Sequence, residues 1–376
     1  MRTQSTLPLL FAVAAAGAIP ALAGTDDWSH FAPAFCYGPF QGEQSPETQT
    51  FPTDEQVLAD LEILNDLCAT IRTYGVDPDT VMERIPAHAD TRGLTIYPGC
   101  WIDNQSWDQT QIDSLIAVGN SGLANIEGLV VGNEFLYRHP ASAATLIARV
   151  NEVRDATGQP TGASEQWHVW RDHPALAAAC DFVFVHIHPY WEEQQIAAAV
   201  THVAGKYALM QQLFPGKRIV ISETGWPSAG NPFGAAVPSL ANHQRFIREF
   251  TAWAKGNEVE YFLFEAFDEP WKGKYGVAER SWGLMDEHRH DKGAIAELLA
   301  GRLGIGIVNP GAGRRVEVDL FAKYPHTLHV SRNLLTWDSF PSQAPGHDRS
   351  WSLSDPPLDA YAGGPTLFFK ATAAAP

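Results

Sequence analysis

Eight short apolar runs, each followed by a stretch with helical spacing, constrain the fold of this chain more than any other feature. The runs are rich in β-branched and aromatic residues, and the stretches between them repeat apolar residues three and four positions apart. The expected strands are 31–37, 70–74, 94–100, 128–133, 161–164, 182–188, 218–222 and 260–267. Eight strands that alternate with helices at intervals of roughly 33 residues predict an α/β fold, a (β/α)8 TIM barrel rather than an open sheet.

The clearest helix start is a capping box. Thr53 is followed three residues later by Gln56, and apolar residues then recur at helical spacing as far as Leu67. Further helices are expected over 141–157, 193–213, 241–255 and 293–299.

The first 23 residues predict a signal peptide. Arg2 precedes a stretch rich in Ala and Leu, and Ala21-Leu22-Ala23 forms a small-x-small cleavage site that makes Gly24 the expected mature N-terminus. A membrane anchor or a buried helix is the alternative. Because no later stretch is long and apolar enough to span a bilayer, we expect an exported protein, extracellular or periplasmic, with no membrane segment after signal removal.

Beyond residue 304 the helical spacing ends and a strict alternation of apolar and charged residues begins at 315–320. Segments 327–331 and 366–370 also have the pattern of strands. We therefore expect the signal peptide at 1–23, the barrel at 24–304 and a small β-sandwich-like module at 305–376. An irregular extension along the barrel is the alternative for the last part.

The charge balance argues against polyanionic partners. The chain has 26 Lys and Arg against 43 Asp and Glu, a net charge of −17, whereas nucleic acid or an anionic membrane requires a cationic surface. We expect no cofactor, no metal and a monomer. The cysteines lack the spacing of a zinc site and could pair in three ways or remain buried thiols. They are Cys36, Cys68, Cys100 and Cys180.

Two glutamates stand at strand ends, where a (β/α)8 barrel carries its chemistry. Glu134 ends the motif VGNE after the fourth strand, and Glu223 begins ETGWPS after the seventh. Taken singly, Asn133 and Glu134 could begin a helix, and Glu223 could be a charge leaving a buried strand. Together, two carboxyl groups at one barrel mouth are what glycosidic bond cleavage requires, one to donate a proton and one to attack.

The motifs VGNE, ETGWPS and FEAFDEPWK together resemble glycoside hydrolase family 17, the β-1,3-glucanase family, over nearly the whole barrel, and the later motifs are most similar to its bacterial branch. The resemblance implies a retaining enzyme that forms a covalent glycosyl-enzyme, with Glu134 as acid/base and Glu223 as nucleophile. In that mechanism the two carboxyl groups lie about 5–5.5 Å apart. The resemblance also implies that Asn133 binds the 2-hydroxyl of the reacting sugar and that Arg72 and Tyr190 flank the nucleophile.

A sugar ring has an apolar face and a rim of hydroxyl groups, so its site needs aromatic platforms edged by polar side chains. Candidate platforms are Tyr37, Tyr74, Trp167, Trp170, Trp191, Trp226, Phe267 and Trp271. Candidate polar partners are Glu265, Glu269 and Lys272, and His188 is expected as a polar neighbour of the nucleophile. Seven of the twelve Trp residues follow expected strand ends and predict a sugar-binding rim: Trp101, Trp167, Trp170, Trp191, Trp226, Trp271 and Trp282. For each single aromatic residue, a core position is the alternative.

The sequence thus predicts a glycoside hydrolase that acts on a neutral β-1,3-glucan. Because the chain has no glucan synthase domain, hydrolysis is favoured over transglycosylation, and a non-catalytic glucan-binding protein is a third reading. His186 and His188 could also serve a zinc hydrolase, but no second group of ligands stands at the other expected strand ends.

Overall fold

The computed structural model describes residues 33–295, 297 and 298, and elsewhere a set of strands. The chain divides into two compact units, one of Ser29–Ile295 and one that combines Met1–Trp28 with Ala296–Pro376. The larger unit contains all of the candidate site residues.

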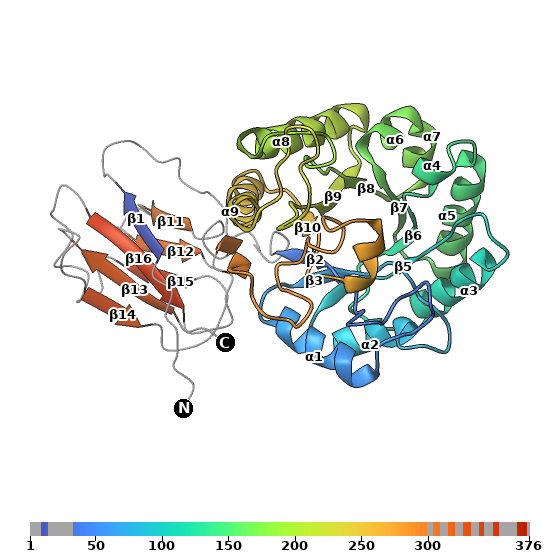
Figure 1. Ribbon diagram of the computed structural model, residues 1–376, viewed down its shortest axis with the longest axis horizontal. Helices are drawn as coiled ribbons and strands as arrows, with labels where there is room; N and C mark the ends of the chain where they lie inside the picture. The colour runs from blue at the N-terminus through green and yellow to red at the C-terminus, as the bar shows by residue number, and fades with distance from the viewer. Residues whose placement is uncertain are drawn as a thin grey trace. The chain divides into compact units, whose positions relative to one another are not determined.

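One sheet of nine parallel strands forms the centre of the larger unit, in the order β4-β3-β2-β10-β9-β8-β7-β6-β5 (Figure 1). The strands are β2 Ala34–Cys36, β3 Thr70–Arg72, β4 Thr95–Tyr97, β5 Gly99–Cys100, β6 Leu129–Asn133, β7 Thr161–Gln166, β8 Phe182–His186, β9 Arg218–Thr224 and β10 Tyr261–Leu263.

The two strands at the ends of this order come from one expected strand, 94–100, which is interrupted at Pro98. Before Pro98 the segment pairs with β3, and after it the segment pairs with β6. Pro98 lacks an N–H for the ladder, yet its carbonyl still accepts a hydrogen bond from the Val130 amide at 3.0 Å. The segment therefore closes the sheet on itself, and the predicted (β/α)8 barrel is confirmed.

Helices surround the barrel (Figure 1). They are α1 Asp54–Asn65, α2 Ile85–Asp90, α3 Asp108–Gly119, α4 Phe135–Arg138, α5 Ala143–Thr157, α6 Trp167–Asp172, α7 Pro174–Ala179, α8 Ile196–Leu213 and α9 Leu240–Gly256, with 3-10 turns η2 Met82–Arg84 and η3 Pro270–Tyr275. The predicted capping box is present: Gln56 donates its amide to Thr53 Oγ1 at 3.3 Å, and Thr53 donates its amide to Gln56 Oε1 at 2.9 Å. None of the helices in the described part of the chain is long and apolar enough to cross a bilayer.

Aromatic rings fill much of the barrel core. Phe182 and Phe184 lie 4.6 Å apart between ring centroids, and Tyr97 lies 4.9 Å from Phe184. Cys36, Val130 and other inward-facing side chains complete this cluster. A core packed in this way confines the polar chemistry to the ends of the strands.

The smaller unit contains two antiparallel sheets, β1-β16-β13-β14 and β11-β12-β15. The strands are β1 Leu9–Val13, β11 Gly304–Val308, β12 Arg315–Asp319, β13 His326–Ser331, β14 Asp338–Pro341, β15 Arg349–Ser352 and β16 Leu367–Ala373. Strands lie where 315–320, 327–331 and 366–370 were expected. Strand β1 falls within the predicted signal peptide and pairs with β16, with Leu9 opposite Ala371. The cleavage site at Ala23 lies outside the described residues.

The four cysteines are buried and form no disulfide bond in the described part of the chain, so the structure shows the second alternative, buried thiols. Burial raises the pKa of Cys100 and of Cys180 to about 12, which keeps both thiols neutral. Cys36 donates its S–H to the Ser222 carbonyl at 3.3 Å.

Candidate active site

The carboxyl ends of the parallel strands bring the two glutamates into one site. Glu223 lies near the end of β9, and Glu134 directly follows β6. The imidazole of His186, at the end of β8, contacts both: Nδ1 lies 3.0 Å from Glu134 Oε1, and Nε2 lies 3.4 Å from Glu223 Oε1. Two carboxyl groups from strands well separated in sequence therefore meet across a single ring.

Glu223 is held in a buried, strongly polar setting. Tyr74 donates its hydroxyl to Oε1 at 2.9 Å, and His188 Nε2 lies 3.1 Å from Oε2. Burial alone would raise the pKa of Glu223, but the two histidines and Arg72 outweigh it and hold the pKa well below its ordinary value. The carboxyl group is therefore ionised in the free protein.

The glycine of ETGWPS has a steric role next to Glu223. A Cβ on Gly225 would lie 2.2 Å from the carbonyl oxygen of Phe264, so only glycine allows β9 and the segment after β10 to approach this closely.

Glu134 stands at a sharp turn between β6 and α4. Gly132, at φ +74°, and Glu134, at φ +52°, both have left-handed backbone conformations, and the pairing of β6 with β7 shifts register between Val130 and Asn133. The Glu134 amide donates to the Ser164 carbonyl at 2.8 Å. The motif VGNE thus encodes a bulge that carries an acidic side chain. Because Glu134 is not a glycine, its left-handed backbone costs roughly 1–2 kcal/mol.

The carboxyl group of Glu134 is also ionised in the free protein. Burial and the charge of Glu223 both act to raise its pKa, but the interaction with His186 outweighs them and lowers it. Gln166 adds a second donor to Oε1 at 3.1 Å.

Arg72 is a fully buried cation beside Glu223 and beside Asn133, the residue that precedes the other glutamate. Its Nη2 donates to Asn133 Oδ1 at 2.8 Å, and its Nη1 donates to Ser164 Oγ and to the Ser222 carbonyl at 3.0 Å each. Nη1 also lies 3.6 Å from Glu223 Oε1. Because Arg72 binds the amide oxygen of Asn133, the amide nitrogen is the polar atom of that side chain that remains for a ligand.

Glu165, on β7, is a buried acid of the site that the sequence analysis missed. Its carboxyl oxygens accept the backbone amides of Leu136 at 2.6 Å and Tyr137 at 3.3 Å, at the start of α4. Burial raises the pKa of Glu165 to about 8, and the charge of Glu134 adds to this rise. Glu165 therefore anchors the turn that carries Glu134.

The raised pKa of Glu165 makes the stability depend on pH. The native state binds one more proton than the unfolded state between the ordinary value of 4.5 and about 8, so stability falls as pH rises through this range. The cost at pH 8 is on the order of 4 kcal/mol, and Glu165→Gln should remove it. In thermal melts, the Tm of E165Q minus the Tm of the wild type should increase by on the order of 10 °C between pH 5 and pH 8.

Exposed Glu127 provides the matched control for this measurement. The Tm of E127Q should follow that of the wild type at every pH. A constant difference in Tm between E165Q and the wild type would show that Glu165 does not titrate in this range.

A second buried cluster follows β10. Lys272 Nζ lies 2.5 Å from both Glu265 Oε2 and Glu269 Oε2, and the Trp271 indole donates to Glu269 Oε1 at 3.1 Å. Burial raises the pKa of Glu265 well above its ordinary value, whereas Lys272 outweighs burial at Glu269 and lowers the pKa there. The cluster therefore holds one neutral acid, one carboxylate and one ammonium group.

Several of the predicted sugar platforms lie in the interior. The indole of Trp170 donates to the Phe184 carbonyl at 2.9 Å, that of Trp226 donates to the Val237 carbonyl at 3.1 Å, and the Tyr37 hydroxyl donates to Asp60 at 3.1 Å. Phe267 is buried as well. The expectation that these four rings face a sugar is wrong for this structure, because they have no exposed face.

The Tyr190 hydroxyl does not bind Glu223. Its hydroxyl donates to the Asn231 carbonyl at 2.7 Å, and its ring packs against Trp282. Tyr74, expected as a platform, provides the phenol on the nucleophile instead.

The predicted tryptophan rim is only partly present. Trp170, Trp226 and Trp282 are fully buried, whereas the side chain of Trp191 is 37% exposed beside Phe233. The other three are partly buried: Trp101, Trp167 and Trp271. Lys206 Nζ covers one face of the Trp167 ring, 3.4 Å from its centroid, which leaves at most the opposite face for a ligand.

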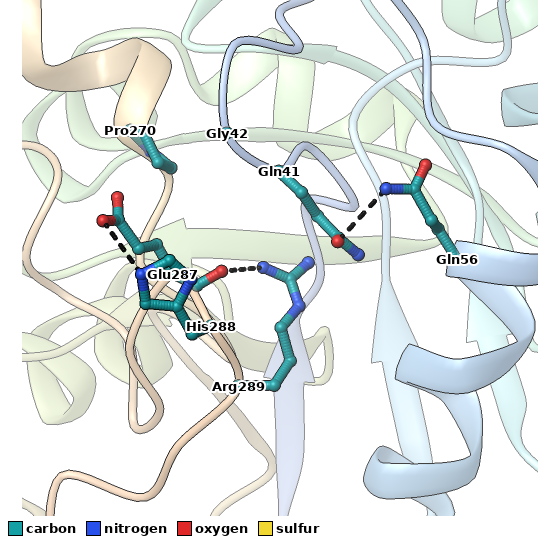
Figure 2. Close-up of a pocket in the computed structure, with 7 residues that line it drawn as sticks. All are labelled: Gln41, Gly42, Gln56, Pro270, Glu287, His288 and Arg289. Carbon is teal, nitrogen blue, oxygen red and sulfur yellow. Dashed lines mark hydrogen bonds and ion pairs between the residues drawn. The ribbon is translucent and has the colours of Figure 1, made fainter.

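A cavity of about 560 Å³ is lined by Gln41, Gly42, Gln56, Pro270, Glu287, His288 and Arg289 (Figure 2). Several of the polar residues that line it are hydrogen-bonded to one another. Gln56 donates to Gln41 Oε1 at 3.2 Å, and Arg289 donates to the Glu287 carbonyl at 3.1 Å. Neither Glu134 nor Glu223 lines it, so we place the reacting centre at the bridged carboxyl groups and not in this cavity. Within the described residues, no three His, Cys, Asp or Glu side chains are grouped as a metal site requires.

The barrel that carries this site matches known proteins. Residues 34–283 match the BtgE/BtgC glycoside hydrolase domain. The btgC protein of Aspergillus niger, named as a glucan endo-1,3-beta-glucosidase, is 34% identical over 297 residues, which cover 70% of this chain and 43% of that protein. This chain thus spans less than half the length of that relative.

Two solved structures of a Rhizomucor miehei β-1,3-glucanosyltransferase share the fold. One, described as a member of glycoside hydrolase family 17, is 28% identical with a TM-score of 0.63, and the match covers 72% of this chain and 99% of that one. The other, an active-site mutant in complex with laminaritriose, is 27% identical with a TM-score of 0.62 over 70% of this chain and 96% of that one. The predicted resemblance to family 17 is confirmed, while the bacterial branch stays a prediction. From its sequence and its barrel alike, the chain belongs to the BtgE/BtgC glycoside hydrolase domain family.

Proposed function

We propose that this chain cleaves β-1,3-glucosidic bonds with retention of configuration, using Glu134 as acid/base and Glu223 as nucleophile. The observation that carries the proposal is the pair of carboxyl groups that His186 bridges at the barrel mouth. The substrate class follows from the relatives, one of which binds laminaritriose in its crystal structure.

In the first half-reaction, a carboxylate oxygen of Glu223 forms a bond to the anomeric carbon. The bond from that carbon to the glycosidic oxygen breaks, and Glu134 supplies the proton that the departing oxygen takes up. The donors around Glu223 keep it ionised for attack. Glu134 must be protonated beforehand, so the approach of substrate has to raise its pKa from the low value of the free protein.

In the second half-reaction, the ester at Glu223 carries no charge. Because the charge of Glu223 raises the pKa of Glu134 in the free protein, its loss lowers that pKa and suits Glu134 to act as a base. Glu134 then removes a proton from the incoming hydroxyl group as this group attacks the anomeric carbon and releases Glu223.

The surrounding residues position the reacting sugar. The amide nitrogen of Asn133 is free to donate to the 2-hydroxyl because Arg72 holds the amide oxygen. Trp191 and Trp271 offer partly exposed rings as platforms, and Lys272, the more exposed member of the Glu269–Lys272 pair, offers a charged partner for a hydroxyl group.

The acceptor decides between hydrolysis and transglycosylation, and we propose that water is the main one. Incubation with laminaripentaose should give shorter oligosaccharides as the dominant products throughout the time course, as resolved by chromatography. Products longer than the substrate as the main early species would assign the chain as a transglycosylase instead.

We also propose that the chain is exported and works as a monomer. The N-terminal sequence supports export through its signal-peptide pattern. Edman sequencing of protein recovered from the culture medium or periplasm should start at Gly24, whereas a start at Met1 would contradict cleavage.

A further inference from the structure

The ring of His186 is fully buried between the two glutamates, yet the mechanism above gives it no task in the proton transfer at Glu134. It lies closer to Glu134 than to Glu223, with contacts of 3.0 Å and 3.4 Å. Which of its nitrogens carries the proton decides what it does to each carboxyl group.

The contact with Glu134 answers this question for Nδ1. The carboxyl group of Glu134 is ionised in the free protein, so its oxygens only accept hydrogen bonds, and the 3.0 Å contact requires an N–H on Nδ1. On the other side of the ring, Nε2 lies 2.7 Å from Ser164 Oγ, 3.4 Å from Glu223 Oε1 and 3.5 Å from Arg72 Nη1. Ser164 Oγ accepts from Arg72 at 3.0 Å and lies 3.0 Å from Ser222 Oγ, so either direction of its bond to Nε2 leaves the proton on Nδ1 in place.

The proton on Nδ1 makes the two oxygens of Glu134 unequal. Oε1 receives the Nδ1–H of His186 at 3.0 Å and the amide of Gln166 at 3.1 Å. In the described part of the chain, Oε2 receives no such donor. An oxygen that already accepts two N–H groups is a poor place for a proton, so a proton that Glu134 takes up will lie on Oε2.

We propose that His186 is a positioning residue that makes Oε2 of Glu134 the oxygen that carries the catalytic proton. The inference rests on the proposed function. In glycosylation, the O–H bond at Oε2 breaks and its proton moves to the glycosidic oxygen, which also takes the electron pair of its broken bond to the anomeric carbon. His186 keeps its own proton throughout.

A comparison of leaving groups tests this role. The sugar alcohol that leaves from laminaripentaose needs protonation, whereas dinitrophenolate leaves without it. His186→Leu should therefore lower kcat/KM for laminaripentaose on the order of 100-fold. The burst of dinitrophenol released from a 2,4-dinitrophenyl β-laminarioside, which reports glycosylation alone, should slow by less than about fivefold. His186→Asn, whose amide N–H reaches the place of Nδ1–H, should recover most of the loss.

His188→Leu is the matched control, because His188 contacts Glu223 and not Glu134. It should slow both substrates to a similar extent, since both need the nucleophile. Similar losses on both substrates in H186L, or a wild-type rate on laminaripentaose, would overturn the proposal. Should H186L fail to fold, Ser164→Ala decides, because it removes the hydroxyl group that lies 2.7 Å from Nε2 and holds the ring against Glu134. It should show the same dependence on the leaving group at a smaller size, and the absence of this dependence overturns the proposal equally.

Glu134→Gln separates this inference from the function on which it rests. If E134Q keeps its rate on laminaripentaose, Glu134 is not the acid and the proposed function fails. If E134Q shows the dependence on leaving group and H186L does not, the function stands and only the role of His186 is removed.

Discussion

Glu223→Ala should lower kcat on β-1,3-glucan by at least about 10⁴-fold, the largest effect that any single substitution in this chain is expected to have. Neither Glu134 nor Glu165 can take its place, because Glu134 donates the proton in the same step and Glu165 is turned toward the start of α4. Glu223→Gln, which keeps the shape of the side chain, should lose turnover equally while laminari-oligosaccharides still bind with nearly unchanged Kd. Isothermal titration and initial rates on laminarin measure both quantities.

Rescue by azide identifies which of the two glutamates is the nucleophile. In E223A, a small anion can enter the space that the carboxyl group left and attack from the α face, which gives an α-glucosyl azide. In Glu134→Ala, the glycosyl-enzyme still forms from an activated substrate, and azide then attacks from the opposite face to give the β product. The same anomer from both variants, or unchanged activity in E223Q, would remove Glu223 from the nucleophile role.

Arg72→Met should have the second largest effect, because it removes a buried cation that four partners share. Breaking a buried pair in this way costs about 3–5 kcal/mol in the free energy of unfolding. Arg72 also lowers the pKa of Glu223, so its loss should move the acid limb of the kcat/KM profile upward by about 1–3 pH units. Urea unfolding and a pH–rate series measure the two effects.

Arg72→Lys is the control for charge. It keeps a cation near Glu223 but cannot reach Asn133, Ser164 and the Ser222 carbonyl together. We expect its acid limb to stay near that of the wild type while its stability falls. An acid limb in R72M that coincides with the wild type would mean that the histidines alone hold Glu223 ionised.

The sequence predicted the barrel and the placement of Glu134 and Glu223 because both depend on local patterns. A capping box fixes the start of α1, and a glycine beside each glutamate permits a tight bend or a close approach. The split of the expected third strand at Pro98 could not be predicted from local patterns. Its first part pairs with β3 and its second part with β6, and these two neighbours come together only when the sheet closes.

The orientation of side chains beyond the strand ends could not be predicted in the same way. Trp170 lies on α6, and the packing of that short helix turns its indole inward, whereas Trp191 in the loop after β8 remains partly exposed. Glu165 was missed because β7 was expected to end at Ser164. The strand runs two residues further, and both of those residues contact the turn at Glu134 or its side chain.

The left-handed backbone at Glu134 has an evolutionary consequence. Glycine or asparagine would adopt this conformation more easily than glutamate. With glutamate at this position, the backbone is therefore less stable than it would be with either of those residues. The contacts of the Glu134 carboxyl group with His186 and Gln166 offset only part of this cost, so the position suits turnover better than stability. In a lineage that came to need glucan binding alone, drift would favour the loss of Glu134 before that of Glu223, whose charge is built into the buried ion pairs of the barrel.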